Sequence, residues 1–121
     1  MKSLVFSEAI AIANNHIFVL NACVEQITKD LGLELDWFKE EAKTVEEIVT
    51  QLEKRLEILL FNSEGIIHQL LYRVDLNEEQ LYAEMNTGNH KSLADLLSKA
   101  IVERELKKVI MRNIYNGKLK V

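Results

Sequence analysis

Apolar residues recur at helical spacing through the first quarter of the chain. Each residue advances a helical wheel by about 100°, and one narrow apolar stripe results: Phe6, Ala9, Ile10, Ala13, Ile17, Leu20, Val24, Ile27 and Leu31. This spacing predicts one helix over about 4–31, with Gly32 as its C-terminal cap. The opposite face is apolar as well: Ala11, Phe18, Val19 and Ala22. We therefore expect residues 9–24 to be shielded from water along most of the helix circumference, at the centre of the fold or against a second copy of the chain.

A second amphipathic stretch predicts a helix over about 44–74. It opens with Thr44 and Glu47, which have the spacing of an N-terminal capping box. Its apolar stripe is regular: Val45, Ile48, Val49, Leu52, Leu56, Leu59 and Leu60. Residues 62–65 read Asn-Ser-Glu-Gly, which is typical of a turn, yet the apolar residues after them continue the same stripe in phase. The pattern leaves a kink and a true break equally open.

The last long helix is predicted over about 91–116, where its apolar residues fall on two sides. One side contains Leu93, Leu96, Leu97, Ala100, Ile101 and Met111, and the other contains Val102, Leu106, Val109 and Ile110. Two apolar sides imply two packing partners. Short helices are expected near 36–43, capped by Asp36, and near 78–85, capped by Asn77. No alternating run predicts a strand, so the expected fold is an all-α helical bundle in a single domain, 1–121.

Composition narrows the class of protein. The chain has 121 residues, of which 48% are hydrophobic and 28% charged, as in one soluble globular domain. Its single cysteine, Cys23, cannot form an internal disulfide, which agrees with a reducing, cytoplasmic environment. The stretch between Glu8 and Glu25 has no Asp, Glu, Lys or Arg. Polar residues nevertheless interrupt it at Asn14, Asn15, His16 and Asn21, which argues against a membrane span or an export signal.

Metal-binding and catalytic patterns are weak. Glu64 and His68 share a helix face, but the di-iron bundle motif needs a second such pair and two further glutamates. Cys23 lies in an apolar helix without a neighbouring positive charge and is interpreted as an inert core residue. His68, Tyr72 and Asp75 would form an acid–base cluster on one side of a helix, although the same spacing is typical of an ordinary exposed face. We expect no catalytic residue, metal or cofactor.

Two further histidines, His16 and His90, have no acidic or histidine partner at a useful sequence spacing. The net charge of −4 gives no general argument for nucleic acid or membrane as a partner. Residues 107–120 are locally basic, but basic residues are favoured near a helix C-terminus by its dipole. This segment could equally pair with the acidic stretch 34–57, within one chain or between copies. Nucleic acid is therefore not expected as a partner.

The expected function is a non-enzymatic protein–protein interaction module that acts as a homodimer, because two long helices have more apolar surface than a small monomer can cover. Another protein as partner stays open. The candidate apolar interface residues are Phe18, Ala22, Ile58, Phe61, Val102, Leu106 and Ile110. Buried amides need hydrogen-bond partners, so the polar residues of the first helix are expected to fix register or an interface. The alternative is a small-molecule pocket beside the first helix, bordered by Asn14, Asn15, His16, Asn21, His68 and Tyr72.

Overall fold

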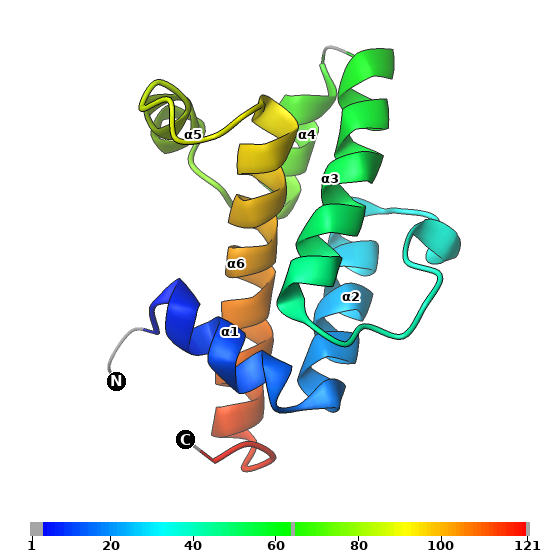
Figure 1. The fold of residues 1–121 in the computed structure, drawn as a ribbon, viewed down its shortest axis with the longest axis vertical. Helices are drawn as coiled ribbons and strands as arrows, with labels where there is room; N and C mark the ends of the chain where they lie inside the picture. The colour runs from blue at the N-terminus through cyan, green and yellow to red at the C-terminus, as the bar shows by residue number, and fades with distance from the viewer. Residues whose placement is uncertain (1–3, 64, 121) are drawn as a thin grey trace.

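Helix α6 (Leu93–Tyr115) runs through the middle of the molecule, and α1, α2, α3 and α5 pack directly against it (Figure 1). The structure is a computed structural model that describes residues 4–63 and 65–120. The elements before α6 are α1 (Phe6–Asn14), α2 (Ile17–Leu31), the 3₁₀ turn η1 (Leu35–Trp37), α3 (Val45–Asn62), α4 (Ile66–Arg73) and α5 (Glu78–Met85). The described residues form no strand, so the all-α bundle is confirmed. None of these helices combines the length and the hydropathy needed to cross a membrane.

The predicted first helix is in fact two helices. Asn15 ends α1, and His16 has extended backbone, with φ −140° and ψ 97°, before α2 begins. Asparagine and histidine both favour helix weakly, and the asparagine side chain competes for backbone hydrogen bonds. Here the Asn15 side-chain amide donates to the Ala11 carbonyl at 2.9 Å. The break turns the chain, so that α1 crosses α6 while α2 runs beside it (Figure 1).

The prediction that residues 9–24 are shielded nearly all round is also wrong. Ala9, Ala13 and Cys23 are fully buried, but Ile17 and Phe18 are 59% and 44% exposed. The central helix is α6, whose buried residues cover most of its circumference and leave one exposed face at Arg104, Lys108 and Arg112. The helical wheel did not indicate that α6 is central, because several buried residues of α6 are polar: Asp95, Ser98, Glu105 and Asn113. Helix α6 therefore lacks the continuous apolar pattern that usually marks a central helix.

Because four helices pack against α6, its second apolar side is covered within one chain. Val102, Leu106 and Ile110 are each 0% exposed. The prediction that these three residues form an interface is therefore wrong, because none of them is accessible to a second copy of the chain. The break between α1 and α2 explains the difference, because α1 is free to pack across a part of α6 that a continuous helix would have left open.

Several local predictions are confirmed at the helix ends. Gly32 follows α2 with φ +64°, the left-handed conformation that glycine adopts most readily. The Thr44 and Asn77 side chains accept hydrogen bonds from the third residue of α3 and α5, at 3.2 and 2.9 Å. Ser92 does the same for α6. The helix predicted over 44–74 is broken and not kinked: α3 ends at Asn62, Ser63 has extended backbone, and α4 runs back in the opposite direction from Ile66 (Figure 1).

The short helix expected near 36–43 is not present, and Asp36 caps nothing. A single 3₁₀ turn spans Leu35–Trp37, and residues 38–44 are irregular. The apolar group at 33–38 is used for anchoring, because Trp37 is buried and its Nε1 donates to Thr28 Oγ1 at 2.6 Å. A charged stretch follows, and a helix this short without an apolar stripe is not stable.

Candidate functional site

The polar residues at the α1–α2 break have structural roles. Asn14 Oδ1 accepts a hydrogen bond from the backbone N–H of Val45 at 2.9 Å, so Asn14 satisfies a free amide at the start of α3. The His16 ring packs edge-on against Phe18, with the ring centroids 5.8 Å apart. The Asn15 amide is bonded to the preceding turn of α1. These contacts lie within one chain, and two of them occupy the side-chain oxygen of Asn14 and the side-chain amide of Asn15.

The other predicted pocket residues do not join them. Asn21 is half-buried on α2, whereas His68 and Tyr72 are exposed on α4. His68 Nδ1 lies 3.2 Å from Glu78 Oε2 across the α4–α5 turn. Glu64, the other half of the weak metal motif, lies outside the described residues. In the two described segments, no three His, Cys, Asp or Glu side chains lie together in a way that could hold a metal ion.

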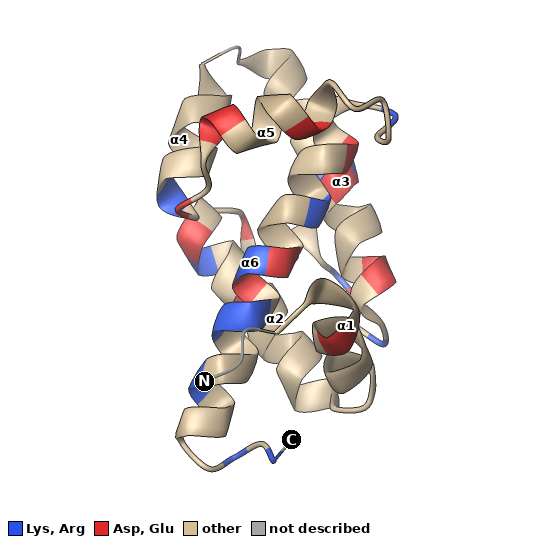
Figure 2. Ribbon diagram, turned by 90° about the vertical axis from the view of Figure 1, so that its left-hand side faces the viewer, with Lys and Arg blue, Asp and Glu red and all other residues tan. Residues whose placement is uncertain are grey.

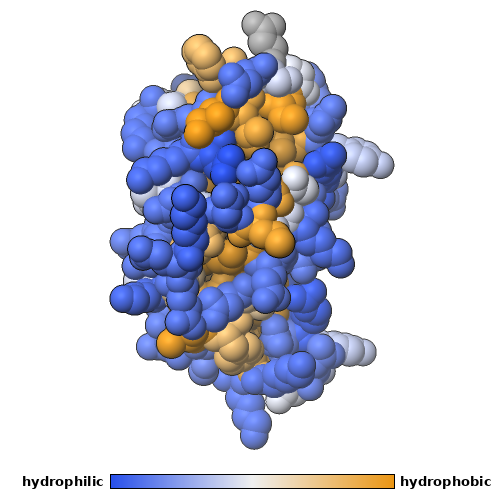
Figure 3. All heavy atoms as spheres, turned by 90° about the vertical axis from the view of Figure 1, so that its right-hand side faces the viewer, coloured by the Kyte–Doolittle hydropathy of each residue, from blue (hydrophilic) through white to orange (hydrophobic). Residues whose placement is uncertain are grey.

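Three of the predicted apolar interface residues are on the surface. Phe61 is 90% exposed and Ile58 is 54% exposed, both on α3, while Phe18 lies at the start of α2. Ala22 is half-buried. Figure 3 views the side of the molecule that includes α3 and η1, and shows hydrophobic side chains in a band between hydrophilic ones. Large exposed apolar groups on one face are typical of an interaction surface.

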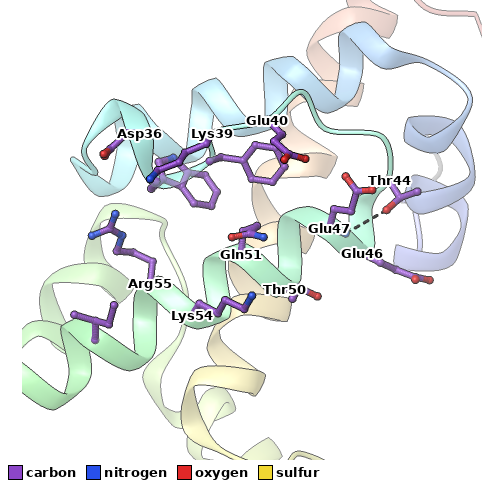
Figure 4. Close-up of a pocket in the computed structure, with 13 residues that line it drawn as sticks. Asp36, Lys39, Glu40, Thr44, Glu46, Glu47, Thr50, Gln51, Lys54 and Arg55 are labelled. Carbon is purple, nitrogen blue, oxygen red and sulfur yellow. Dashed lines mark hydrogen bonds between the residues drawn. The ribbon is translucent and has the colours of Figure 1, made fainter.

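An open groove lies on this side of the molecule, between α3 and the segment 36–40 (Figure 4). Its volume is about 920 Å³. Trp37, Phe38 and Ile58 supply its apolar surface, and the other lining residues are Asp36, Lys39, Glu40, Thr44, Glu46, Glu47, Thr50, Gln51, Lys54 and Arg55. We call this surface the α3 groove. Its walls consist of one face of α3 and the irregular segment that the buried Trp37 fixes in place.

Opposite charges gather at the two ends of the α3 groove. Glu46 and Glu47 belong to the first turn of α3, and Glu40 lies near them (Figure 4). Lys54 and Arg55 lie two turns further along α3, and Asp36 and Lys39 belong to the segment on the other side of the groove (Figure 4). The uncharged Thr50 and Gln51 lie between the two ends. The groove is therefore acidic where α3 begins and mainly basic in its second half.

A second, smaller cavity lies on the opposite side of α6, among α1, α5 and α6. Its volume is about 460 Å³. Its apolar lining consists of Phe6, Leu76, Leu81, Leu96 and Ala100, and its polar lining consists of Asn77, Gln80, Glu84, His90, Lys99 and Glu103. We call it the α5 pocket. Figure 2 views the side of the molecule on which α5 and α1 lie.

His90, in the loop before α6, does have acidic neighbours, contrary to the expectation from its sequence spacing. Its Nε2 lies 3.1 Å from Glu84 Oε1 and its Nδ1 lies 3.8 Å from Asp95 Oδ2. Lys99 Nζ pairs with the other Asp95 oxygen at 3.0 Å. Burial would raise the pKa of Asp95, but hydrogen bonds from Lys99 and from the Lys91 backbone outweigh it and lower that pKa. Asp95 is thus a fixed negative charge behind the pocket.

A third polar cluster lies between α2 and α6, in the core. Glu105 is 1% exposed, and its Oε2 has no hydrogen-bond partner among the described residues. Burial raises its pKa from 4.5 to about 7, and the adjacent Asp30 carboxylate adds to the rise. Asp30 is itself held by Lys108 Nζ at 3.1 Å. Burial also raises the pKa of the Cys23 thiol to about 12, with a further contribution from Glu105, so Cys23 is an inert core residue, as its sequence context predicted.

A scan against protein-family models and searches of curated proteins and of solved structures found no match to this chain. The α3 groove and the α5 pocket are therefore the candidate sites of this chain, and neither was predicted. The hydrophobic pattern placed Ile58 and Phe61 on the outer side of α3. The residues opposite them belong to a loop, whose sequence has no periodicity from which to predict its position.

Proposed function

We propose that this chain is a non-enzymatic interaction module that forms a homodimer through the α3 groove. The observation behind the proposal is the exposure of Phe61 and Ile58 beside a groove with apolar surface and charged ends. Fully burying one such side chain contributes about 1.5–3 kcal/mol. A second copy would supply that burial. The buried free thiol of Cys23 suits a reducing compartment, and we place the protein in the cytoplasm.

The charge pattern favours a second copy of the chain as the partner. In a two-fold interface each contact between residues i and j occurs twice. With the axis near Thr50 and Gln51, the acidic start of one α3 faces the basic second half of the other. Glu46 of one chain then meets Lys54 of its partner, and the reverse pair forms as well. Such complementarity selects an antiparallel arrangement, because a parallel one would place like charges together.

The interface has to extend beyond the groove itself. A stable protein–protein interface buries about 800 Å² on each partner. Phe61 lies one turn beyond Ile58 on α3, outside the groove lining. In the antiparallel arrangement, these two residues extend toward the start of the partner's α3. We therefore expect Phe61 and Ile58 to contribute most of the binding free energy, as large apolar anchors do, and the charges to fix orientation.

A charge-exchange experiment tests this arrangement. The variants Lys54→Glu and Glu46→Lys are made separately, and their mass in solution is measured by light scattering, alone and mixed. Each variant alone places like charges at both symmetry-related contacts and is expected to be monomeric or much weaker as a dimer. The mixture restores attraction at both contacts and is expected to form a heterodimer.

The matched control reverses charges outside the groove, with Glu79→Lys on α5 and Lys118→Glu near the C-terminus. Neither residue lines the groove, so both variants should keep the mass of the unmodified protein. The proposal is rejected if the unmodified chain has the mass of one copy at micromolar concentration. It is also rejected if the two groove variants dimerise as well alone as they do together.

A further inference from the structure

The α5 pocket has the dimensions of a small-molecule site. Ligand pockets have volumes of about 300–1,000 Å³ and apolar walls with a few polar groups, and this pocket measures about 460 Å³. Phe6, Leu81 and Leu96 give it an apolar interior, contributed by three different helices. It shares no lining residue with the α3 groove, so it is a separate site.

One face of α5 supplies the polar wall of the pocket. Asn77, Gln80, Leu81 and Glu84 follow one another at helical spacing, so the residues that line the pocket share a face. The Asn77 oxygen is already used to cap α5. The Glu84 carboxylate and the Gln80 amide oxygen are hydrogen-bond acceptors on this wall. A ligand that meets α5 would therefore need to donate hydrogen bonds.

The charge around the pocket is negative on the α5 side. Helix α5 contains three glutamates and no Lys or Arg, and Figure 2 shows its acidic positions. On the opposite wall, Lys99 is neutralised by Asp95 at 3.0 Å, and Glu103 is paired with Lys107. Glu84 contacts the His90 ring, and the structure pairs it with no Lys or Arg among the described residues. A cation thus gains more from this wall than an anion does.

From these observations we infer that the α5 pocket binds a small organic ammonium ion, with its apolar body against Phe6, Leu81 and Leu96 and its nitrogen at Glu84. This site is independent of the proposed dimer, because it lies on other elements. It is also a different site from the one that the polar residues of the first helix had predicted.

The test is a titration of the ¹⁵N-labelled protein with three probes that share one ring and differ in charge: phenethylammonium, 2-phenylethanol and 3-phenylpropionate. The expected result is saturable shifts of amides in α5 and in the start of α6, strongest for the ammonium and weaker for the alcohol. Removing one partly exposed charge with Glu84→Gln should weaken ammonium binding about threefold. Binding of the alcohol should stay unchanged, which separates lost charge from a damaged pocket.

Two further variants complete the test. Glu79→Gln removes a charge from α5 outside the pocket lining and should leave all three affinities unchanged. Ala100→Phe fills the cavity and should abolish the shifts, with the circular dichroism spectrum as a check of the fold. The inference is overturned if none of the probes shows saturable shifts in α5. It is equally overturned if the carboxylate or the alcohol binds as tightly as the ammonium, or if Glu79→Gln weakens ammonium binding as much as Glu84→Gln does.

Discussion

Replacing Glu105 by Gln should make the protein more stable, by much more at pH 8 than at pH 5. Glu105 is buried between α6 and α2, with the Asp30 carboxylate beside it and one oxygen that finds no hydrogen-bond partner in the described part of the chain. At low pH its protonated carboxyl is neutral, as a glutamine amide is. At high pH its negative charge has to be accommodated in the core, and this cost is absent from the variant.

The magnitude follows from the pKa of the Glu105 carboxyl. This pKa is raised from 4.5 in the unfolded chain to about 7 in the folded protein. The folded state therefore holds a proton that the unfolded state has already lost, so stability falls as pH rises through this window. The full change corresponds to about 3 kcal/mol. Asp30 does not offset it there, because its pKa is lowered from 3.8 and its titration falls below the window.

The assay is urea unfolding followed by circular dichroism, at one fixed protein concentration and at a series of pH values. The difference in unfolding free energy between Glu105→Gln and the unmodified protein should be below about 1 kcal/mol at pH 5 and about 3 kcal/mol at pH 8. Glu103→Gln is the matched control, since Glu103 is one half-turn away on α6, half-buried and paired with Lys107. A difference that is the same at both pH values would refute the reasoning.

Three other predictions test the fold. Leu106→Ala should lower the unfolding free energy by about 2–5 kcal/mol in urea titrations, because Leu106 is fully buried in one chain. A smaller decrease would contradict the burial of this side chain within one chain. Asn14→Ala should cost about 1 kcal/mol in the same assay, because the Val45 N–H at the start of α3 loses its acceptor. An unchanged midpoint would show that water replaces this contact at no cost. Cys23 should not react with a thiol reagent such as Ellman's under native conditions and should react fully in denaturant; rapid native labelling would contradict its burial.

Local rules predicted the helix ends well because each cap depends on residues a few positions apart. Asn77 caps α5 and Gly32 ends α2 as expected. Of the capping box expected at the start of α3, one half forms: Thr44 accepts from the Glu47 N–H, whereas the Glu47 carboxylate accepts from the Lys43 N–H at 3.2 Å. The same locality explains the mistake at Asn15 and His16. The apolar stripe continues through these residues in phase, but the stripe records only which side is apolar, and cannot show that the backbone changes direction.

The central helix was misidentified for a different reason. Hydrophobic periodicity assumes that buried positions are apolar, and α6 buries Glu105 and Asn113. Asn113 donates to the Val109 carbonyl of its own helix at 2.8 Å, so its burial needs no distant partner. Glu105 is buried beside a residue of another helix, Asp30. A helical wheel describes one helix, so it cannot show that a polar residue is buried against a residue of another helix.

The candidate sites were only partly predictable. Ile58 and Phe61 were found because they depart from a regular stripe on one helix. The remainder of the α3 groove depends on where Trp37 anchors an irregular segment against α2. The α5 pocket joins Phe6 to residues of α5 and α6 that lie far away in the sequence. Contacts of this kind are set by the packing of whole helices and leave no motif in a single sequence.

Sedimentation equilibrium of the unmodified protein tests the proposed assembly most directly. Across a series of micromolar concentrations, the account predicts a mass that rises toward twice that of one chain, and a Phe61→Ser variant that stays at the mass of one chain. A single-chain mass for the unmodified protein at every concentration would contradict the account, as would a dimer that the Phe61 substitution leaves intact.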